Sequence, residues 1–272
     1  IYDLLGLTVD ASTWLPEDRI SASFDNIADS QDLSATLMIS YLTAASDIAR
    51  QAIGNKDAPR LATTYSNSAG LSQHEWERLE GAPYGTRGGI STLHSFPADG
   101  EYVFSMRFMS GWGERFHDID VSIDRERAAL LHYGGDIDYQ GLKEFPVETD
   151  RVFVRAGEHR VTAAFIRQMD GPYEDLLKPN ARSLTGTETS YGTTSPPNLM
   201  HMVIEGPYNP VGISETATRK RIFACRPTTT AEESPCATSI VKRLASNAFG
   251  APINDDQLHD LMQFYALGAE DG

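Results

Sequence analysis

The feature that most constrains the fold is a set of segments that alternate apolar and polar residues in the middle of the chain. Over residues 59–212, glycine and proline are frequent and short runs carry an apolar side chain at every second position. Two of these runs place their apolar side chains on one face: Tyr102, Phe104, Met106 and Phe108, and then Ile119, Val121 and Ile123. Such alternation between Gly- and Pro-containing turns is typical of antiparallel strands with one buried face. We therefore expect an antiparallel β-sandwich in this region.

The segment before the sandwich has a helical period instead. Its apolar side chains recur three to four positions apart: Leu37, Tyr41, Ala45, Ile48 and Ala52. Ser34 is a suitable N-cap for this helix, and Gly54 would end it. The first residues, IYDLLGL, are typical of the last turns of a helix closed by Gly6. We therefore expect this chain to be a segment of a longer polypeptide.

The segment after the sandwich also indicates helices. Ser234 and Pro235 fit an N-cap followed by proline at the first helical position. A second helix would begin at Asn254, where Gln257 completes a capping box, and would end at Gly268. This pattern predicts a short C-terminal pair of helices that packs on another part of the protein.

These patterns predict an α+β multidomain chain with three parts. A helical module covers residues 1–58, a jelly-roll sandwich covers 59–212, and a helical module clasped by a disulfide covers 213–272.

The charge of the chain excludes several partners. The formal net charge is −15 and the isoelectric point is about 4.8. Nucleic-acid binding requires clustered Lys and Arg, and anionic membranes also attract basic segments. No apolar run reaches the roughly 20 residues that a membrane-spanning helix needs. We therefore expect neither nucleic acid nor a transmembrane segment.

Cys225 and Cys236 lie eleven positions apart in the C-terminal part. A disulfide between them is favoured in an oxidising compartment and would contribute roughly 2–3 kcal/mol in the chain-entropy model. Two free thiols remain an alternative. Metal ligation is another, but it would require further Cys or His residues at close spacing.

Carboxylates on one predicted strand form a candidate calcium site. Asp118, Asp120 and Asp124 would share the polar face of that strand, and Asp136 and Asp138 lie in the Gly-rich loop that follows. Carboxylate oxygens are the ligands that calcium prefers. The alternatives are a solvated strand face and an ordinary turn.

Aromatic residues in the loops form a candidate carbohydrate site. Tyr133 and Tyr139 flank the same Gly-rich loop, and Trp112 lies between two glycines. Sugar recognition pairs an aromatic platform with polar contacts to hydroxyl groups, so these three rings are candidates. Packing of Trp112 within its loop is the alternative.

Three stretches resemble one family, and they occur in the family's order. They are FDNIADSQDLSATLMISYLTAASDIARQAIG, then GAPYGTRGGISTLHSFPADGEYVFSMRF, and then RKRIFACRP followed by Cys236-Ala237. The family comprises large secreted cytochrome-like proteins of planctomycetes, acidobacteria and some proteobacteria. The resemblance implies a sandwich similar to calcium-dependent carbohydrate-binding modules and a periplasmic or extracellular location.

The resemblance also implies that haem-bearing modules or subunits are partners. With two cysteines and no Cys-x-x-Cys-His motif, this segment does not attach haem c, which is expected only in adjoining sequence. We therefore expect a non-catalytic binding and scaffold segment of a multi-haem protein, with the sandwich contacting carbohydrate or a partner subunit. One alternative is a polysaccharide hydrolase or lyase that uses acidic residues of the sandwich. Another is an accessory subunit of an extracytoplasmic redox complex.

Overall fold

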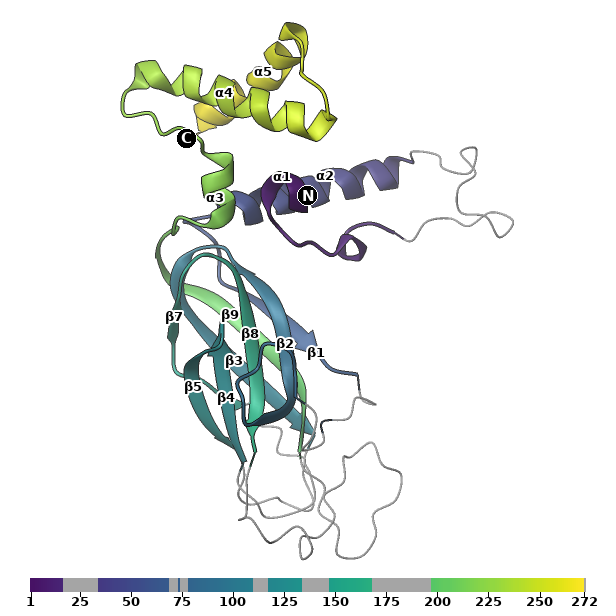
Figure 1. Cartoon of the computed structure of the whole chain (residues 1–272), viewed down its shortest axis with the longest axis vertical. Coiled ribbons are helices and arrows are strands. Elements are labelled where there is room, and N and C mark those ends of the chain that lie inside the picture. The colour runs from purple at the N-terminus through teal and green to yellow at the C-terminus, as the bar shows by residue number, and fades with distance from the viewer. Residues whose placement is uncertain are drawn as a thin grey trace, which may run out of the picture. The chain divides into compact units, whose positions relative to one another are not determined.

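The computed structural model describes most of the chain (Figure 1): residues 1–16, 34–68, 73, 78–109, 117–133, 147–167 and 197–271. The chain forms two compact units. The helical unit combines residues 1–54 with residues 215–272, and the sandwich unit comprises residues 55–214. The two helical segments, expected as separate modules 1–58 and 213–272, share one unit because their side chains form a common core.

The sandwich unit contains two antiparallel sheets. The first sheet has the order β1-β9-β3-β6, with β7 also paired to β3; its strands are β1 (Leu61–Ser66), β3 (Asp99–Met109), β6 (Val147–Glu148), β7 (Val152–Val154) and β9 (Asn198–Gly212). The second sheet has the order β2-β8-β4-β5; its strands are β2 (Thr86–Phe96), β4 (His117–Ile123), β5 (Glu126–Tyr133) and β8 (Gly157–Ile166). The predicted antiparallel sandwich between helical segments is confirmed.

Alternating side chains of both sheets meet in one core. The fully buried members from the two predicted runs are Tyr102, Phe104, Met106, Ile119 and Val121, and they pack with Phe96, Val161, Phe165, Met202 and Ile204. The remaining members of the two runs, Phe108 and Ile123, are partly buried against the same core. Successive side chains of a β-strand point to opposite faces of the sheet, so the residues between these core positions face outward.

A buried polar network stabilises the register shift in β2 between Arg87 and Ile90. The Gln73 amide oxygen accepts hydrogen bonds from the backbone N–H groups of Gly89 and Leu199, both at 2.9 Å. Arg87, which is 3% exposed, donates to the Gln73 carbonyl oxygen at 3.0 Å and covers a ring of the core. Gly89 has φ +99°, and a Cβ atom there would collide with the backbone of Ala163. Glycine is therefore required where the bulged strand approaches β8.

The helical unit has a much smaller core. Its elements are α1 (Tyr2–Leu5), the 3-10 turn η1 (Ala11–Thr13), α2 (Ala35–Ile53), α3 (Ala217–Ile222), α4 (Thr230–Phe249) and α5 (Asp255–Asp271). The buried side chains are Leu7, Ala44, Ile48, Ala52 and Ile222, with Ile240 and Leu244 of α4 packed against them. The C-terminal pair is therefore anchored through α4 to the first helices. None of the helices described here is long and apolar enough to cross a bilayer.

Three helix ends follow the sequence prediction. The Ser34 hydroxyl accepts from the N–H of Leu37 at 3.1 Å and caps α2. Asn254 and Gln257 exchange two hydrogen bonds, of 2.8 and 3.0 Å, in the predicted capping box. Gly6 takes the left-handed conformation after α1.

Two helix ends differ from the prediction. Helix α4 begins at Thr230 and not at Pro235, which lies in its second turn. The Glu232 carboxylate, which accepts from the N–H of Thr228 at 2.9 Å, stabilises this earlier start. Helix α5 continues through Gly268 to Asp271, since glycine weakens a helix without ending it.

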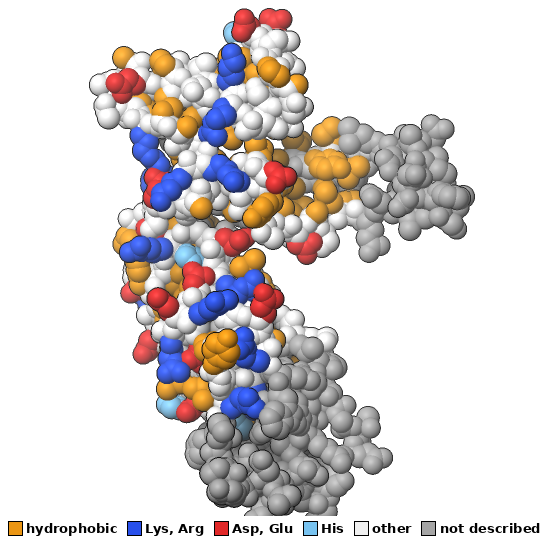
Figure 2. Space-filling view, viewed as in Figure 1, with side chains coloured by type: hydrophobic (Ala, Val, Ile, Leu, Met, Phe, Trp, Pro, Cys, Tyr) orange, Lys and Arg blue, Asp and Glu red, His pale blue; other side chains and the backbone are white. Residues whose placement is uncertain are grey.

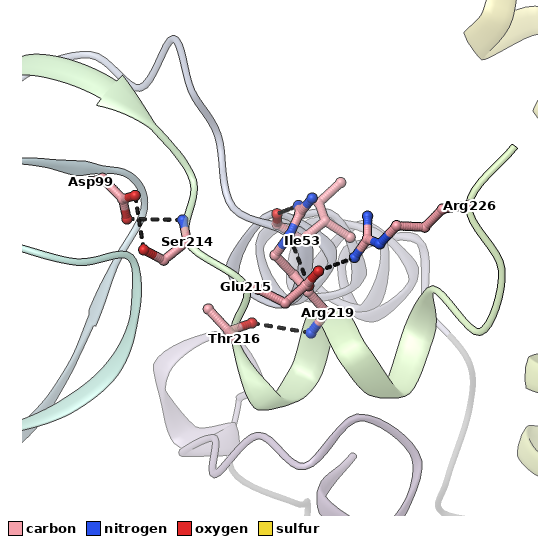
Figure 3. Close-up of polar contacts among 7 residues, drawn as sticks. All are labelled: Ile53, Asp99, Ser214, Glu215, Thr216, Arg219 and Arg226. Atoms are coloured by element: carbon pink, nitrogen blue, oxygen red, sulfur yellow. Dashed lines mark hydrogen bonds and ion pairs between the residues drawn. The ribbon is translucent and has the colours of Figure 1, made fainter. Parts of the chain in front are cut away.

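Arginine side chains satisfy the carbonyl groups at three helix ends. Arg219 donates to Ile53 at the end of α2 (Figure 3). Arg221 donates to carbonyl groups of α1 at 3.1 and 3.3 Å, and Arg243 donates to Ile222 at the end of α3 at 2.8 Å. The last four carbonyl groups of a helix lack internal partners, so each guanidinium stabilises a helix terminus. The basic run at residues 219–221 therefore has a structural use.

The disulfide joins Cys225, in the segment before α4, to Cys236 inside α4, with the two Cα atoms 5.9 Å apart. It fastens the segment between α3 and α4 onto the second turn of α4. Neither cysteine is free, which decides between the disulfide and the two alternatives that the sequence left open.

Candidate functional site

Three side chains form a row across the outer face of the first sheet. Glu101 of β3 lies opposite Tyr208 of β9 on one side and opposite Phe153 of β7 on the other. Adjacent strands lie about 4.8 Å apart, so the two aromatic residues are roughly 10 Å apart with the carboxylate between them. Phe153 is 56% exposed. The row therefore presents two aromatic side chains and one acceptor to solvent.

Local irregularities in the strands direct Tyr208 outward. The β3–β9 register shifts on both sides of Glu101, the residue opposite Tyr208. Gly206 has φ +155°, and a Cβ atom there would collide with the Tyr102 ring. The backbone of β9 thus lies directly on a core ring, while Tyr208 projects from the opposite side.

Polar contacts fix the Glu101 carboxylate. Its Oε2 atom accepts a hydrogen bond from Asn209 at 3.0 Å and pairs with the Arg151 guanidinium at 3.4 Å. The same guanidinium carbon lies 4.4 Å from the centroid of the Tyr208 ring, within the range of a cation–π contact. One arginine therefore holds both the carboxylate and the ring.

A second ion pair lies where β9, the strand of Tyr208, borders β1. Arg60 pairs with Glu205 at 3.2 Å, and its guanidinium carbon lies 5.3 Å from the Tyr208 centroid. Desolvation, the hydrogen bond to Glu205 and the charge of that carboxylate raise the pKa of Tyr208, although the two guanidinium groups act in the opposite direction. The phenol therefore stays neutral and donates to Glu205. We call these side chains the Tyr208 face: Arg60, Glu101, Arg151, Phe153, Glu205 and Tyr208.

The Tyr208 face is suited to binding. Both carboxylates are paired with guanidinium groups, so their oxygens are oriented acceptors. The guanidinium groups are oriented donors, and the aromatic side chains provide apolar surface. The face thus combines all three contact types that a polyhydroxylated ligand uses.

The described carboxylates of the predicted calcium site each have partners of their own. Asp118 pairs with His132 of β5 at 2.6 Å. Asp120 is 1% exposed and binds Arg127 and Ser122. A buried carboxylate requires such a partner, which explains an acidic residue inside this strand.

Asp124 lies in the turn after β4 and not on the strand itself. One carboxylate oxygen accepts from the N–H of Arg160 at 2.9 Å, and the other lies 2.6 Å from the Nδ1 atom of His159. No three His, Cys, Asp or Glu side chains in the described ranges are placed to hold a metal. Asp136 and Asp138 lie outside the described residues, so the calcium site stays a prediction.

Of the three predicted aromatic contacts, one lies among the described residues. Tyr133 ends β5 and packs on Phe108, with the ring centroids 4.3 Å apart, and desolvation raises its pKa. It contributes to the edge of the core. Trp112 and Tyr139 lie outside the described residues, and their role in binding stays a prediction.

The Tyr208 face was missed by the sequence reasoning. Tyr208 stands in the motif GPYNP, whose two prolines obscure the alternation of a strand. Glu205 lies on the same strand, and the other members come from β3, from β7 and from the residues just before β1 and β7. A solvent-directed tyrosine between prolines is the one local signal that could have indicated it.

Two half-buried histidines lie opposite each other on neighbouring strands of the second sheet. His94 of β2 lies directly opposite His159 of β8, and its Nδ1 atom lies 2.8 Å from the Tyr65 hydroxyl. Desolvation, followed by the charge of His159, lowers the pKa of His94 from 6.5 to about 4. His94 is therefore neutral at physiological pH.

Comparison with family models finds one match. The model described as "PSD3: Protein of unknown function (DUF1587)" matches residues 1–54, which are the N-terminal part of the helical unit. No curated protein matches the chain.

Three solved structures are similar to part of the chain. The CBM36-1 domain of a multidomain xylanase from the hindgut metagenome of Trinervitermes trinervoides has 14% identity and a TM-score of 0.31, over 55% of this chain and 99% of that one. A carbohydrate-binding module CBM36 in complex with calcium and xylotriose has 8% identity and a TM-score of 0.28, over 55% and 100%. The GH26-CBM35 β-(1,4)-mannanase of Podospora anserina has 11% identity and a TM-score of 0.29, over 66% and 35%. Superpositions this loose carry no inference about a ligand.

Proposed function

We propose that this chain is a non-catalytic binding and scaffold segment of a larger exported protein, and that its sandwich binds carbohydrate through the Tyr208 face. The observation that carries the proposal is the row of Tyr208, Glu101 and Phe153 on an outer sheet face. The fixed polar groups around it support the same function.

The chemistry of the Tyr208 face favours a sugar over a protein partner. Pyranose rings present C–H surfaces to aromatic side chains and hydroxyl groups to charged donors and acceptors. Hydrogen bonds to charged groups contribute about 1.5–3 kcal/mol, more than neutral ones. Because the acceptors and donors are already held in place by each other, little side-chain ordering is required on binding.

The scaffold part of the proposal concerns the helical unit. Its helices leave large apolar side chains exposed, among them Ile39 and Leu42 of α2 and Phe264 and Leu267 of α5. In the family that the sequence resembles, haem-bearing modules follow these segments, and we propose such modules or subunits as partners. The disulfide supports a periplasmic or extracellular location.

The binding part is tested by measuring the affinity of the whole segment for a panel of glycans, with and without calcium. Tyr208→Ala and Phe153→Ala should each weaken binding about tenfold, which corresponds to about 1.4 kcal/mol. Leu130→Ala on the second sheet removes another exposed apolar side chain and should leave affinity unchanged. Binding that ignores both aromatic substitutions would place the site elsewhere. A dependence on calcium that Asp118→Asn removes would support the predicted metal site.

The haem context is tested on the native protein. Its intact mass and a haem stain should show a polypeptide longer than 272 residues that carries covalent haem. A native protein without porphyrin would contradict this part and leave the carbohydrate proposal intact.

A further inference from the structure

We infer that the ligand of the Tyr208 face is a neutral polysaccharide. The face binds internal sugar units of an extended glycan chain. This inference rests on the proposed carbohydrate function and adds the charge and the shape of the glycan. It follows from how the face balances its own charges and from the geometry of its aromatic row.

The charges of the Tyr208 face cancel in pairs. Arg151 pairs with Glu101 and Arg60 pairs with Glu205, so two positive groups meet two negative groups. A carboxylate or sulfate on a sugar would have to displace one of these acidic partners, and would leave that partner unpaired. The remaining guanidinium hydrogens can still donate to neutral hydroxyl groups, because each guanidinium carries five N–H donors.

The charge of the whole chain acts in the same direction. The sequence has a formal net charge of −15, which repels a polyanion at distances up to the Debye length of about 8 Å at physiological ionic strength. Figure 2 shows basic and acidic side chains interspersed over the visible side of the sandwich, without a broad basic region there. A neutral glycan avoids this repulsion altogether.

The geometry of the row indicates an extended ligand. Tyr208 and Phe153 are separated by two strand spacings, roughly 10 Å, which is about the length of two linked pyranose rings. One sugar therefore reaches only one aromatic side chain and Glu101, whereas three consecutive sugars reach both aromatics. Phe153 is 56% exposed, so a chain bound along the row can continue past this side chain.

The test compares matched oligosaccharides on the whole segment. Neutral β-1,4-linked glucose oligomers of one to six units are measured against oligomers of the same length with a carboxyl group at each C6. We expect the neutral series to gain at least tenfold in affinity between one and three units and then to level off. Raising the salt from 50 to 500 mM should change its affinity less than twofold, since no ion pair forms on binding.

A charge variant sharpens the comparison. Glu101→Gln frees Arg151 and gives the Tyr208 face a net positive charge, so it should improve the ratio of carboxylated to neutral binding about tenfold. Glu148→Gln is the matched control, because Glu148 lies on the same sheet face, bonded to Ser105 and outside the Tyr208 face. That control should leave the ratio unchanged.

The outcomes separate this inference from the function on which it rests. Tighter binding of the carboxylated series by the unmodified chain, with strong weakening in salt, would overturn the neutral ligand. Equal affinity for one and three units would overturn the extended ligand. Failure of every glycan to bind a folded chain would overturn the carbohydrate function itself, and capture of a protein through Tyr208 and Arg151 would assign the face to a protein partner.

Discussion

The sandwich unit and the helical unit are stabilised in different ways. In the described part of the chain, one cluster of fifteen buried side chains joins the two sheets, whereas the helical cluster has five. The helical unit adds a disulfide and three arginines that bind helix-terminal carbonyl groups. Burial of apolar surface contributes most of the stability where two broad sheet faces meet. Specific polar or covalent links become important to stability where the shared surface is small.

The comparison predicts that a core truncation will destabilise the sandwich most. Phe104 is fully buried between the sheets. Phe104→Ala should lower the free energy of unfolding of the sandwich by about 3–5 kcal/mol, because it removes apolar contacts and leaves a cavity. Calorimetry of the whole segment should show the sandwich transition shifted and the helical transition unmoved. Leu130→Ala, at a 41% exposed position, should shift neither.

The low pKa of His94 predicts that the same unit is sensitive to acid. The unfolded chain protonates His94 near pH 6.5, whereas the folded chain does so only near pH 4. The folded state therefore binds fewer protons in this window, so the titration of His94 lowers stability as the pH falls from about 7 to 4 and has no further effect below pH 4. The expected decrease in the free energy of unfolding over this range is about 3 kcal/mol.

His94→Gln keeps an acceptor for the Tyr65 hydroxyl and removes the titration. Denaturant unfolding followed at several pH values should then show a flatter profile between pH 7 and 4. His201→Gln, which alters an exposed histidine bonded to Ser66, should retain the original slope. An unchanged slope in His94→Gln would assign the acid sensitivity to other groups.

The disulfide should matter to the helical unit alone. Replacing both cysteines, Cys225→Ser with Cys236→Ser, should lower the stability of that unit by roughly 2–3 kcal/mol, since the unfolded chain gains loop entropy. Hydrogen exchange should become faster in α4 and α5 and stay constant in the strands. Equal loss in the two units would show that they unfold together.

The smallest expected effect concerns one arginine cap. Arg243→Met keeps the apolar stem and removes the donors to the end of α3, which should lower the stability of the helical unit by about 1 kcal/mol. Lys242→Met, an exposed neighbour on the same helix, provides the control. The midpoint temperature of the helical unit's thermal unfolding measures the effect of each of the two substitutions.

Local patterns predicted much of the fold. The strand alternation around Phe104 and Val121, the N-cap at Ser34 and the capping box at Asn254 each depend on residues close in sequence, and each is confirmed. The start of α4 was missed because Pro235 is a strong first-turn signal, while the competing contact from Glu232 reaches back to Thr228. The helical stripe of α2 was shifted, with Ala44 buried and Tyr41 exposed, since its partners come from distant segments.

The candidate site was less predictable. Tyr208 and Glu101 become neighbours through a strand pairing whose register shifts on both sides of Glu101, and no local pattern encodes such shifts. The burial of Asp120 was equally hidden, because its partner Arg127 belongs to the next strand. Alternation places a carboxylate on an outer face, but it does not reveal which neighbour will cover it.

The sandwich is tied at one turn where the chain both enters and leaves it. Asn55 donates to the carbonyl of Pro97 at 2.8 Å, and Ser214 donates from its N–H and hydroxyl to Asp99, both at 2.9 Å (Figure 3). The two accepting residues, Pro97 and Asp99, lie within three residues of each other. The sandwich is therefore an insertion between the two sequence segments of the helical unit. Arg219 binds the carbonyl of Ile53, so the helical unit is closed across this junction, and a short bridge in place of residues 55–214 would keep the path of its helices.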